Sequence, residues 1–339
     1  MEHLLNATEL DAASPGRPPD AVTASGGRRP RLGDPLFRVA TTACGATVAV
    51  AMFGLAGVLV YRSIPSVSAL GIEVLTTVAW SPVNGQYGAL AALAGTVLST
   101  LVAMVISVPL ALAIALLLVD LVPPRVARVL GTGIEMLAAI PSIVFGMVGI
   151  FVIVPFVQGS LVPWLLDSPF GRIPGVAPGP KFQGGGVSIF TAGLVLAFMV
   201  LPFITAVSRD VLNMVPRVAK EAGYGMGSTT WEVMHKISLR YANSGIVGAI
   251  FIGFGRALGE TMAVAYLIGS LYTDLPHSVF DPGTSIASLI AQQFAEATDP
   301  VQVSALVQLG LVLFVITMGF QLLAQAWLRR VQRRTGGRA

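Results

Sequence analysis

The sequence predicts an all-α integral membrane protein with six transmembrane helices and both termini in the cytoplasm. Of its 339 residues, 54% are hydrophobic and only 11% are charged, whereas a soluble domain carries about 25% charged residues. The mean hydropathy is +0.78. Six apolar segments are each near or above the roughly 20 residues that a helix needs to cross a bilayer. Such a chain cannot cover itself with polar side chains and is expected in a lipid membrane.

The first predicted span covers residues 39–61, which are too many for the core of a signal peptide and lack a cleavage pattern of small residues after them. Residues 1–35 are rich in Pro, Gly, Ala and Ser. They bury too little apolar surface to offset the entropy of ordering, so we expect a disordered cytoplasmic tail. The transmembrane domain then occupies residues 36–335, with further spans at about 89–119, 129–157, 188–208, 244–270 and 302–328.

Basic residues give the orientation of these spans. Lys and Arg gather in residues 120–128, in residues 209–240 and after residue 328, whereas residues 271–300 hold four acidic residues and no Lys or Arg. Because basic loops stay in the cytoplasm, both termini are expected there. The net charge of +4 and the pI of about 9.5 are explained in this way. We expect no nucleic acid as partner, because basic patches with interleaved aromatic residues are missing.

The longest cytoplasmic segment, residues 209–240, is expected to form two short helices joined by a turn at residues 225–227. Pro216 can begin the first helix, and Ser228 or Thr229 can cap the second. Small residues at a turn let a partner surface approach closely. One interpretation is a hairpin that merely connects two spans. The other is a lever that transmits movement into the membrane.

This segment resembles the signature of permease subunits of ABC importers, which has Glu-Ala-Ala, a Gly four residues later and Ile-x-Leu-Pro ten residues beyond that Gly. The chain has Glu221-Ala222-Gly223, Gly227, Ile237 and Leu239 at this spacing, with Gly223 in place of the second Ala and Arg240 in place of the Pro. The resemblance implies a type I ABC-importer permease fold. It also implies that residues 209–240, called the coupling segment below, dock on a separate ATPase through Glu221, Ala222, Gly223, Gly227, Trp231 and Ile237.

The motor is expected in another chain. The sequence has no Gly-x-x-x-x-Gly-Lys-Ser/Thr phosphate loop and no soluble domain large enough to hold a nucleotide. Its only cysteine, Cys44, lies inside an apolar segment and offers no cysteine-based metal site. We therefore expect neither catalytic residues nor a bound cofactor or metal in this chain, and ATP and Mg on the partner ATPase.

The fifth span carries Arg256 and Glu260 in an otherwise apolar helix. Each charge costs about 2.5 to 3.5 kcal/mol at the bilayer centre, so a partner or a water-lined cavity must offset it. Their spacing of four residues would place them on one helix face, where they can pair directly. Either this pair locks the bundle, or Arg256 donates to an oxyanion while Glu260 holds the Arg and accepts from a protonated phosphate oxygen.

In the third span, small and polar residues recur at helical spacing and form one stripe that must face protein or water. They are Glu135, Ala138, Ser142, Gly146 and Gly149. Pro141 removes a backbone hydrogen bond and is expected to kink the helix, either as a gate or as a packing feature. Glu135 has three candidate roles: a second partner of Arg256, a partner of another subunit's Arg, or a hydrogen-bonded packing carboxylate. The predicted substrate path therefore comprises Arg256, Glu260, Thr261, Glu135 and Ser142.

The run Gly-Arg256-Ala-Leu-Gly-Glu260-Thr261-Met-Ala-Val is similar to the hallmark of the PstC-type permease of bacterial phosphate ABC importers. Shorter pieces such as Trp80-Ser-Pro82 extend the resemblance over most of residues 80–300. The resemblance implies a multi-pass subunit of the bacterial inner membrane that carries inorganic phosphate. The implied partners are a PstA-type second permease, two PstB-type ATPase subunits and a PstS-type phosphate-binding protein.

Three alternatives remain open. The first is a permease for another oxyanion, such as sulfate or molybdate, because Arg binds these anions too. The second is a proton-coupled secondary transporter with Glu135 and Glu260 as relays, which predicts uptake without an ATPase. The third is a membrane anchor for phosphate signalling, which would explain a docking segment without transport.

Overall fold

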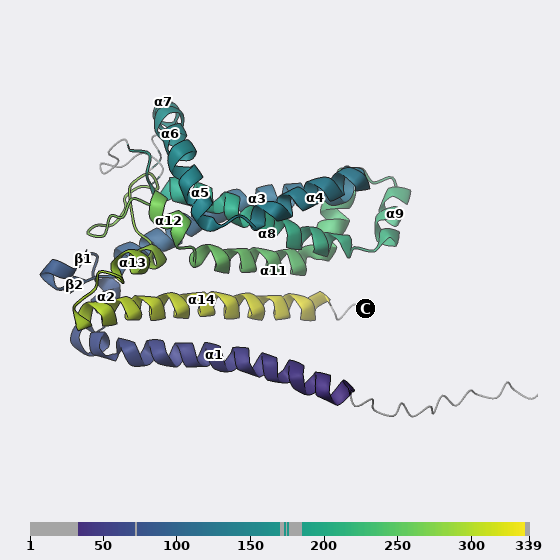
Figure 1. Cartoon of the computed structure of the whole chain (residues 1–339). Helices are drawn as coiled ribbons and strands as arrows, with labels where there is room; N and C mark the ends of the chain where they lie inside the picture. Colours follow the sequence, from purple (N-terminus) through teal and green to yellow (C-terminus); the bar gives the residue numbers. More distant parts are fainter. Residues whose placement is uncertain (1–32, 72, 170–172, 174, 176–184, 336–339) are drawn as a thin grey trace, which may run out of the picture. The chain divides into compact units, whose positions relative to one another are not determined.

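The computed structural model describes residues 33–71, 73–169, 173, 175 and 185–335. Within this part of the chain, six helices are long and apolar enough to cross a membrane, which confirms the predicted number (Figure 1). They cover Leu36–Leu70, Leu90–Leu121, Ser142–Asp167, Ile189–Asn213, Thr230–Leu258 and Pro300–Arg330. Residues 1–32 of the predicted disordered tail lie outside the described residues. Its last three residues, 33–35, belong to a helix that begins at Gly33.

The chain divides into two units, residues 1–54 and residues 55–339. The described part of the first unit is the beginning of α1 (Gly33–Leu70). Every side chain from Leu36 to Gly54 is exposed in this chain, although most of them are apolar. An exposed apolar surface along a helix of this length is typical of a span that faces lipid or another membrane helix.

The second unit contains the end of α1, a short 3-10 helix at Pro82–Asn84 and all other described helices and strands. They are α2 (Glu73–Thr76), the antiparallel strands β1 (Trp80–Ser81) and β2 (Gln86–Tyr87), α3 (Leu90–Leu116), α4 (Pro124–Ala138), α5 (Ser142–Val148), α6 (Val154–Phe156), α7 (Val162–Asp167), α8 (Ile189–Asn213), α9 (Arg217–Gly225), α10 (Thr230–Glu232), α11 (Leu239–Leu258), α12 (Met262–Leu267), α13 (Ile286–Gln293) and α14 (Pro300–Thr335). Wider π-helical turns extend α3 and join α5 to α7 and α10 to α11; they cover Leu117–Leu121, Gly149–Ile153, Val157–Leu161 and Val233–Ser238.

Helix α8 is the centre of the second unit. In its most apolar stretch 72% of the residues are buried, compared with at most 33% in the other candidate spans. It begins where the Ser188 hydroxyl accepts a hydrogen bond from the backbone N–H of Thr191. Gly193 lets α3 approach, because a Cβ atom there would lie 2.7 Å from Cβ of Val102 and 2.9 Å from the carbonyl oxygen of Ser99. Small residues therefore set how closely α3 and α8 pack.

The third span is interrupted at Pro141, where the sequence predicts a kink, and its bounds differ from residues 129–157. Helix α4 ends at Ala138 and α5 begins at Ser142, directly after Pro141. Proline lacks the N–H that would continue the helix and clashes with the preceding turn. The helix after the break continues to Asp167, into residues predicted to form a loop, and it is this second part that is apolar enough to span.

The fifth span also differs from the predicted residues 244–270. Its helix begins at Thr230, because the Thr229 hydroxyl accepts from the N–H of Glu232 while the Glu232 carboxylate accepts from the N–H of Thr229. This reciprocal cap satisfies two donors at the helix start. The helix ends at Leu258 and resumes as α12 after three non-helical residues, Gly259 to Thr261. The span is therefore displaced toward the coupling segment and interrupted at Glu260.

The segments between the first and second spans and before the last span fold onto each other. Trp80 and Tyr87 are buried and pack edge to face with ring centroids 5.2 Å apart. The Tyr87 hydroxyl donates to the Asp299 carboxylate over 3.2 Å. Burial and then this contact raise the pKa of Tyr87 above its ordinary value.

Gly193→Ala tests whether the close contact of α3 with α8 holds the unit together. The new methyl group would meet the backbone of α3, so we expect the substitution to lower stability by about 1 to 3 kcal/mol. Gly248→Ala in α11 is the matched control, since no atom lies within 4 Å of its Cβ position and alanine gains up to about 1 kcal/mol over glycine in a helix. Thermal unfolding in detergent measures both. Equal effects of the two substitutions would contradict this account of the packing.

Candidate functional site

The coupling segment folds largely as its sequence predicts. Helix α9 begins directly after Pro216 and ends at Gly225, and Thr229 caps the helix that follows. Gly227 in the intervening turn has a φ of +82°, a conformation that favours glycine. The second helix is not short, however. It continues from Thr230 through the π-helical turns and α11 to Leu258, so the second helix of the coupling segment and the fifth span form one helical rod.

Two of the predicted ATPase contacts, Gly223 and Ile237, touch each other within this chain. Gly223 on α9 is buried, and a Cβ atom there would lie 2.5 Å from Cδ1 of Ile237 and 3.2 Å from Cγ2 of Val233. A Cβ atom at this position would therefore require the Ile237 side chain to shift. Gly223 and Ile237 hold the two helices of the coupling segment together.

The other predicted contacts lie on the surface. Glu221, Ala222, Gly227 and Trp231 are exposed, and the Trp231 ring stacks on His235 with 8° between the ring planes. Further large apolar side chains of this segment are exposed as well: Met214, Val218, Tyr224 and Met226. A group of exposed apolar side chains on one segment is typical of a docking surface.

A partly buried ion pair that sequence analysis missed fixes α9 to the second span. Nζ of Lys220 lies 2.6 Å from Oδ1 of Asp120, and the two side chains are only 18% and 7% exposed. Asp120 lies in the π-helical turns at the cytoplasmic end of the second span. An acidic residue at the end of an apolar segment was the only signal for this pair, because 100 residues separate Asp120 from Lys220.

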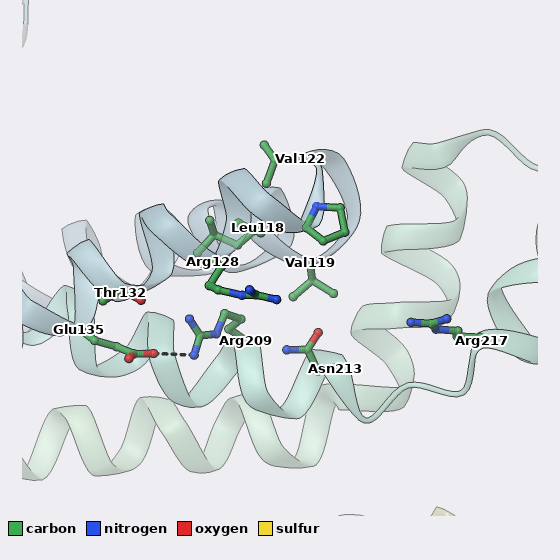
Figure 2. A pocket seen from close by; sticks show the side chains of 11 residues that line it. Leu118, Val119, Val122, Arg128, Thr132, Glu135, Arg209, Asn213 and Arg217 are labelled. Carbon is green, nitrogen blue, oxygen red and sulfur yellow. Dashed lines mark hydrogen bonds and ion pairs between the residues drawn. The ribbon is translucent and has the colours of Figure 1, made fainter.

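Glu135 has a partner in its own chain. Oε1 of Glu135 lies 2.5 Å from Nη2 of Arg209 on α8 (Figure 2). The hypothesis that Glu135 pairs with Arg256 is therefore wrong, and the hydrogen-bonded carboxylate is the role that the geometry supports. The sequence places Arg209 at the start of the coupling segment, but α8 continues to Asn213, so Arg209 lies one turn inside the helix.

The Glu135–Arg209 pair forms one wall of a cavity of about 470 Å³ between the end of the second span, α4, α8 and the start of α9. The polar side chains that line this cavity are Arg128, Thr132, Glu135, Arg209, Asn213 and Arg217. We call it the basic cavity. Figure 2 shows Arg128 coming from α4, Arg209 and Asn213 from α8, and Arg217 pointing in from α9.

The two broken spans pack against each other directly after their breaks. A Cβ atom on Gly146 of α5 would lie 3.2 Å from Cα of Ala263 on α12, and Gly149 meets the side chain of Leu267. Gly146 meets Ala263 and the later residue Gly149 meets the later residue Leu267, so the two helices run parallel. Ser142 and Thr261, at the starts of these helices, therefore lie at the same end of the packed pair.

The predicted pairing of Arg256 with Glu260 on one helix face is wrong. Helix α11 ends at Leu258, so Glu260 lies in the link to α12 and not one turn beyond Arg256. Among the described residues, neither side chain forms an ion pair. Arg256 is exposed in the last turn of α11, where the helix dipole favours a cation, and Glu260 is half-buried. The Thr261 hydroxyl donates to the carbonyl oxygen of Gly259 over 3.3 Å.

Comparison with known proteins agrees with this architecture. The model of the family "Binding-protein-dependent transport system inner membrane component" matches residues 107–336. The phosphate transport system permease protein PstC of Pasteurella multocida is 45% identical, over 89% of this chain and 93% of that protein. Its counterpart in Mesorhizobium japonicum is 42% identical, over 91% of this chain and 94% of that protein.

A solved structure shows the same fold. A chain in the crystal structure of a bacterial alginate ABC transporter, in complex with an alginate pentasaccharide-bound periplasmic protein, aligns with a TM-score of 0.58. The alignment covers 89% of this chain and 98% of that chain at 13% identity. The chain thus belongs to the binding-protein-dependent transport system inner membrane components of bacterial ABC transporters and, within them, to the PstC-type phosphate permeases.

Proposed function

We propose that this multi-pass protein of the bacterial inner membrane forms the path for inorganic phosphate together with a second permease of the PstA type. The observation that carries the mechanism is the pair of broken spans, α4–α5 and α11–α12, which pack together beyond their breaks. Non-helical backbone is tolerated at membrane depth only where it is buried in protein or lines a water-filled cavity. Two such breaks at one place support a path through the bundle at this position.

Arg256, Glu260, Thr261 and Ser142 supply the chemistry of this path. The Arg256 guanidinium is exposed on this chain and offers parallel N–H donors that match phosphate oxygens. Glu260 can accept a hydrogen bond from the protonated oxygen of hydrogen phosphate, which fully ionised sulfate lacks. Because Arg256 and Glu260 are not paired to each other, the anion itself can join them. The Glu135–Arg209 pair lies on the cytoplasmic side of the break in the third span.

The coupling segment would receive the driving movement. Two PstB-type ATPase subunits, which hold ATP and Mg, would drive the importer, and one of them would dock on the exposed apolar side chains around Trp231. The rod from Thr230 to Leu258 is about 40 Å long at 1.5 Å per residue, and it ends at Arg256 and the break. A tilt imposed on its cytoplasmic end is therefore delivered directly to the predicted phosphate contacts. A PstS-type phosphate-binding protein would supply the anion from the opposite side.

Lys220→Met tests whether the ion pair with Asp120 fixes the coupling segment. The substitution leaves a buried carboxylate without its partner, so we expect a loss of about 3 kcal/mol in stability and slower phosphate-dependent ATP hydrolysis by the assembled importer. The double variant Asp120→Leu with Lys220→Met should recover most of the stability, because no unpaired charge remains.

Lys236→Met is the matched control, since Lys236 pairs with Glu232 on the surface of the same segment and exposed pairs contribute little. Thermal unfolding and ATP hydrolysis are measured on all variants. A double variant as unstable as the single one would show that the Asp120–Lys220 pair is not the cause.

Labelled phosphate uptake by vesicles with the complete importer tests the proposed function. Arg256→Gln should slow uptake about 10- to 100-fold, since a hydrogen bond to a charged group contributes about 1.5 to 3 kcal/mol. Arg329→Gln, at the cytoplasmic end of α14, should leave uptake unchanged. Sulfate and molybdate should not compete.

Each alternative predicts a different result in this assay. Competition by sulfate or molybdate would indicate a permease for other oxyanions. Uptake that persists with an inactive ATPase would indicate a proton-coupled transporter. A wild-type complex that assembles without taking up phosphate would indicate a signalling anchor, and full uptake by Arg256→Gln would remove Arg256 from the path.

A further inference from the structure

The basic cavity has an unbalanced charge. Three guanidinium groups and one carboxylate line it, and the carboxylate of Glu135 is already paired with Arg209. Among the described residues, Arg128 and Arg217 have no ion-pair partner. Two other carboxylates lie close to the cavity in sequence, and both have other partners: Oδ1 of Asp210 is 3.5 Å from Nη2 of Arg209, and Asp120 pairs with Lys220. Several positive charges in one cavity favour the binding of an anion.

The size and the donors of the cavity indicate the class of anion. A volume of about 470 Å³ lies within the roughly 300 to 1,000 Å³ of small-molecule sites. Guanidinium groups match the geometry of phosphate oxygens, and the Asn213 amide and Thr132 hydroxyl add neutral hydrogen-bonding groups. We propose that the basic cavity binds a phosphate group, through Arg128, Arg209 and Arg217, at the cytoplasmic end of the bundle.

This site is separate from the predicted path. Neither Arg256 nor Glu260 lines the basic cavity. Its arginines come from three elements, α4, α8 and α9 (Figure 2), so a bound phosphate group would tie the coupling segment to the bundle beside the Asp120–Lys220 pair. The inference rests on the proposed function in one respect: the orientation of the permease places the cavity at the cytoplasmic side. The phosphate group belongs either to free inorganic phosphate or to the headgroup of an anionic lipid.

The test uses the assembled importer without its phosphate-binding protein, in nanodiscs of phosphatidylcholine. All preparations carry Arg256→Gln, which removes the predicted path contact and leaves the cavity intact. Equilibrium dialysis with labelled inorganic phosphate compares this background with the added pair Arg128→Gln and Arg217→Gln. Loss of a charged hydrogen-bond donor weakens affinity about tenfold for each arginine, so we expect roughly 100-fold weaker binding. Arg125→Gln, on α4 but outside the lining, should not change it.

A second arm distinguishes the lipid source. The same preparations are placed in nanodiscs that contain phosphatidylglycerol, and the lipids that remain bound are counted by native mass spectrometry. Binding of labelled phosphate that is lost in the double variant assigns the site to free phosphate. Retained phosphatidylglycerol that is lost only in the double variant assigns it to a lipid headgroup. Phosphate and lipid binding that are both absent, or both unchanged in the double variant, overturn the proposal.

Failure of this inference and failure of the proposed function give different results. Phosphate uptake by the unmodified complete importer is measured alongside the binding assays. Intact uptake with unchanged binding in the double variant would refute only the phosphate site in the basic cavity. Absent uptake in the unmodified importer would refute the proposed function, whatever the cavity binds.

Discussion

A protein in hydrocarbon must satisfy its charges and its backbone polar groups from within, and the arrangement of this bundle follows from that constraint. The acidic residues at the cytoplasmic ends of the second and third spans each meet a basic residue from a distant part of the chain: Asp120 meets Lys220, and Glu135 meets Arg209. The third and fifth spans are interrupted after Ala138 and Leu258. The helices that follow these breaks, α5 and α12, pack against each other. Polar groups are thus concentrated in a few contacts that also connect distant parts of the chain.

Close packing of small residues supplies the rest of the cohesion. Lipid tails are as apolar as the side chains, so helices associate through contact and not through the exclusion of water. Gly193 lets α8 meet α3, and Gly245 and Gly253 let α11 meet the side chains of α8. Helix α8, the most buried helix, is therefore packed closely against α3 and against α11. The basic cavity, by contrast, lies where α4 and the start of α9 leave α8 partly uncovered.

Local signals predicted the parts of the fold that depend on neighbouring residues. Segment length gave the six spans, Pro141 gave the break in the third span, and Pro216 and Thr229 gave the helix starts in the coupling segment. Contacts between distant residues could not be predicted in this way. The partner of Glu135 is 74 residues away, and it depends on how α4 and α8 are rotated, which hydropathy does not encode.

The predicted pairing of Arg256 with Glu260 failed for a different reason, and their separation bears on the proposed mechanism. A spacing of four residues places two side chains on one face only if the helix is continuous, and Gly259, with its high helix cost, lies between them. Had the helix continued, the two charges would neutralise each other and leave little attraction for an anion. The break separates them, because Arg256 stays on the rod that starts at Thr230 while Glu260 belongs to the link before α12. In the mechanism proposed above, a tilt of the rod would change the distance between Arg256 and Glu260, so the affinity for phosphate would follow the position of the coupling segment without any further moving part.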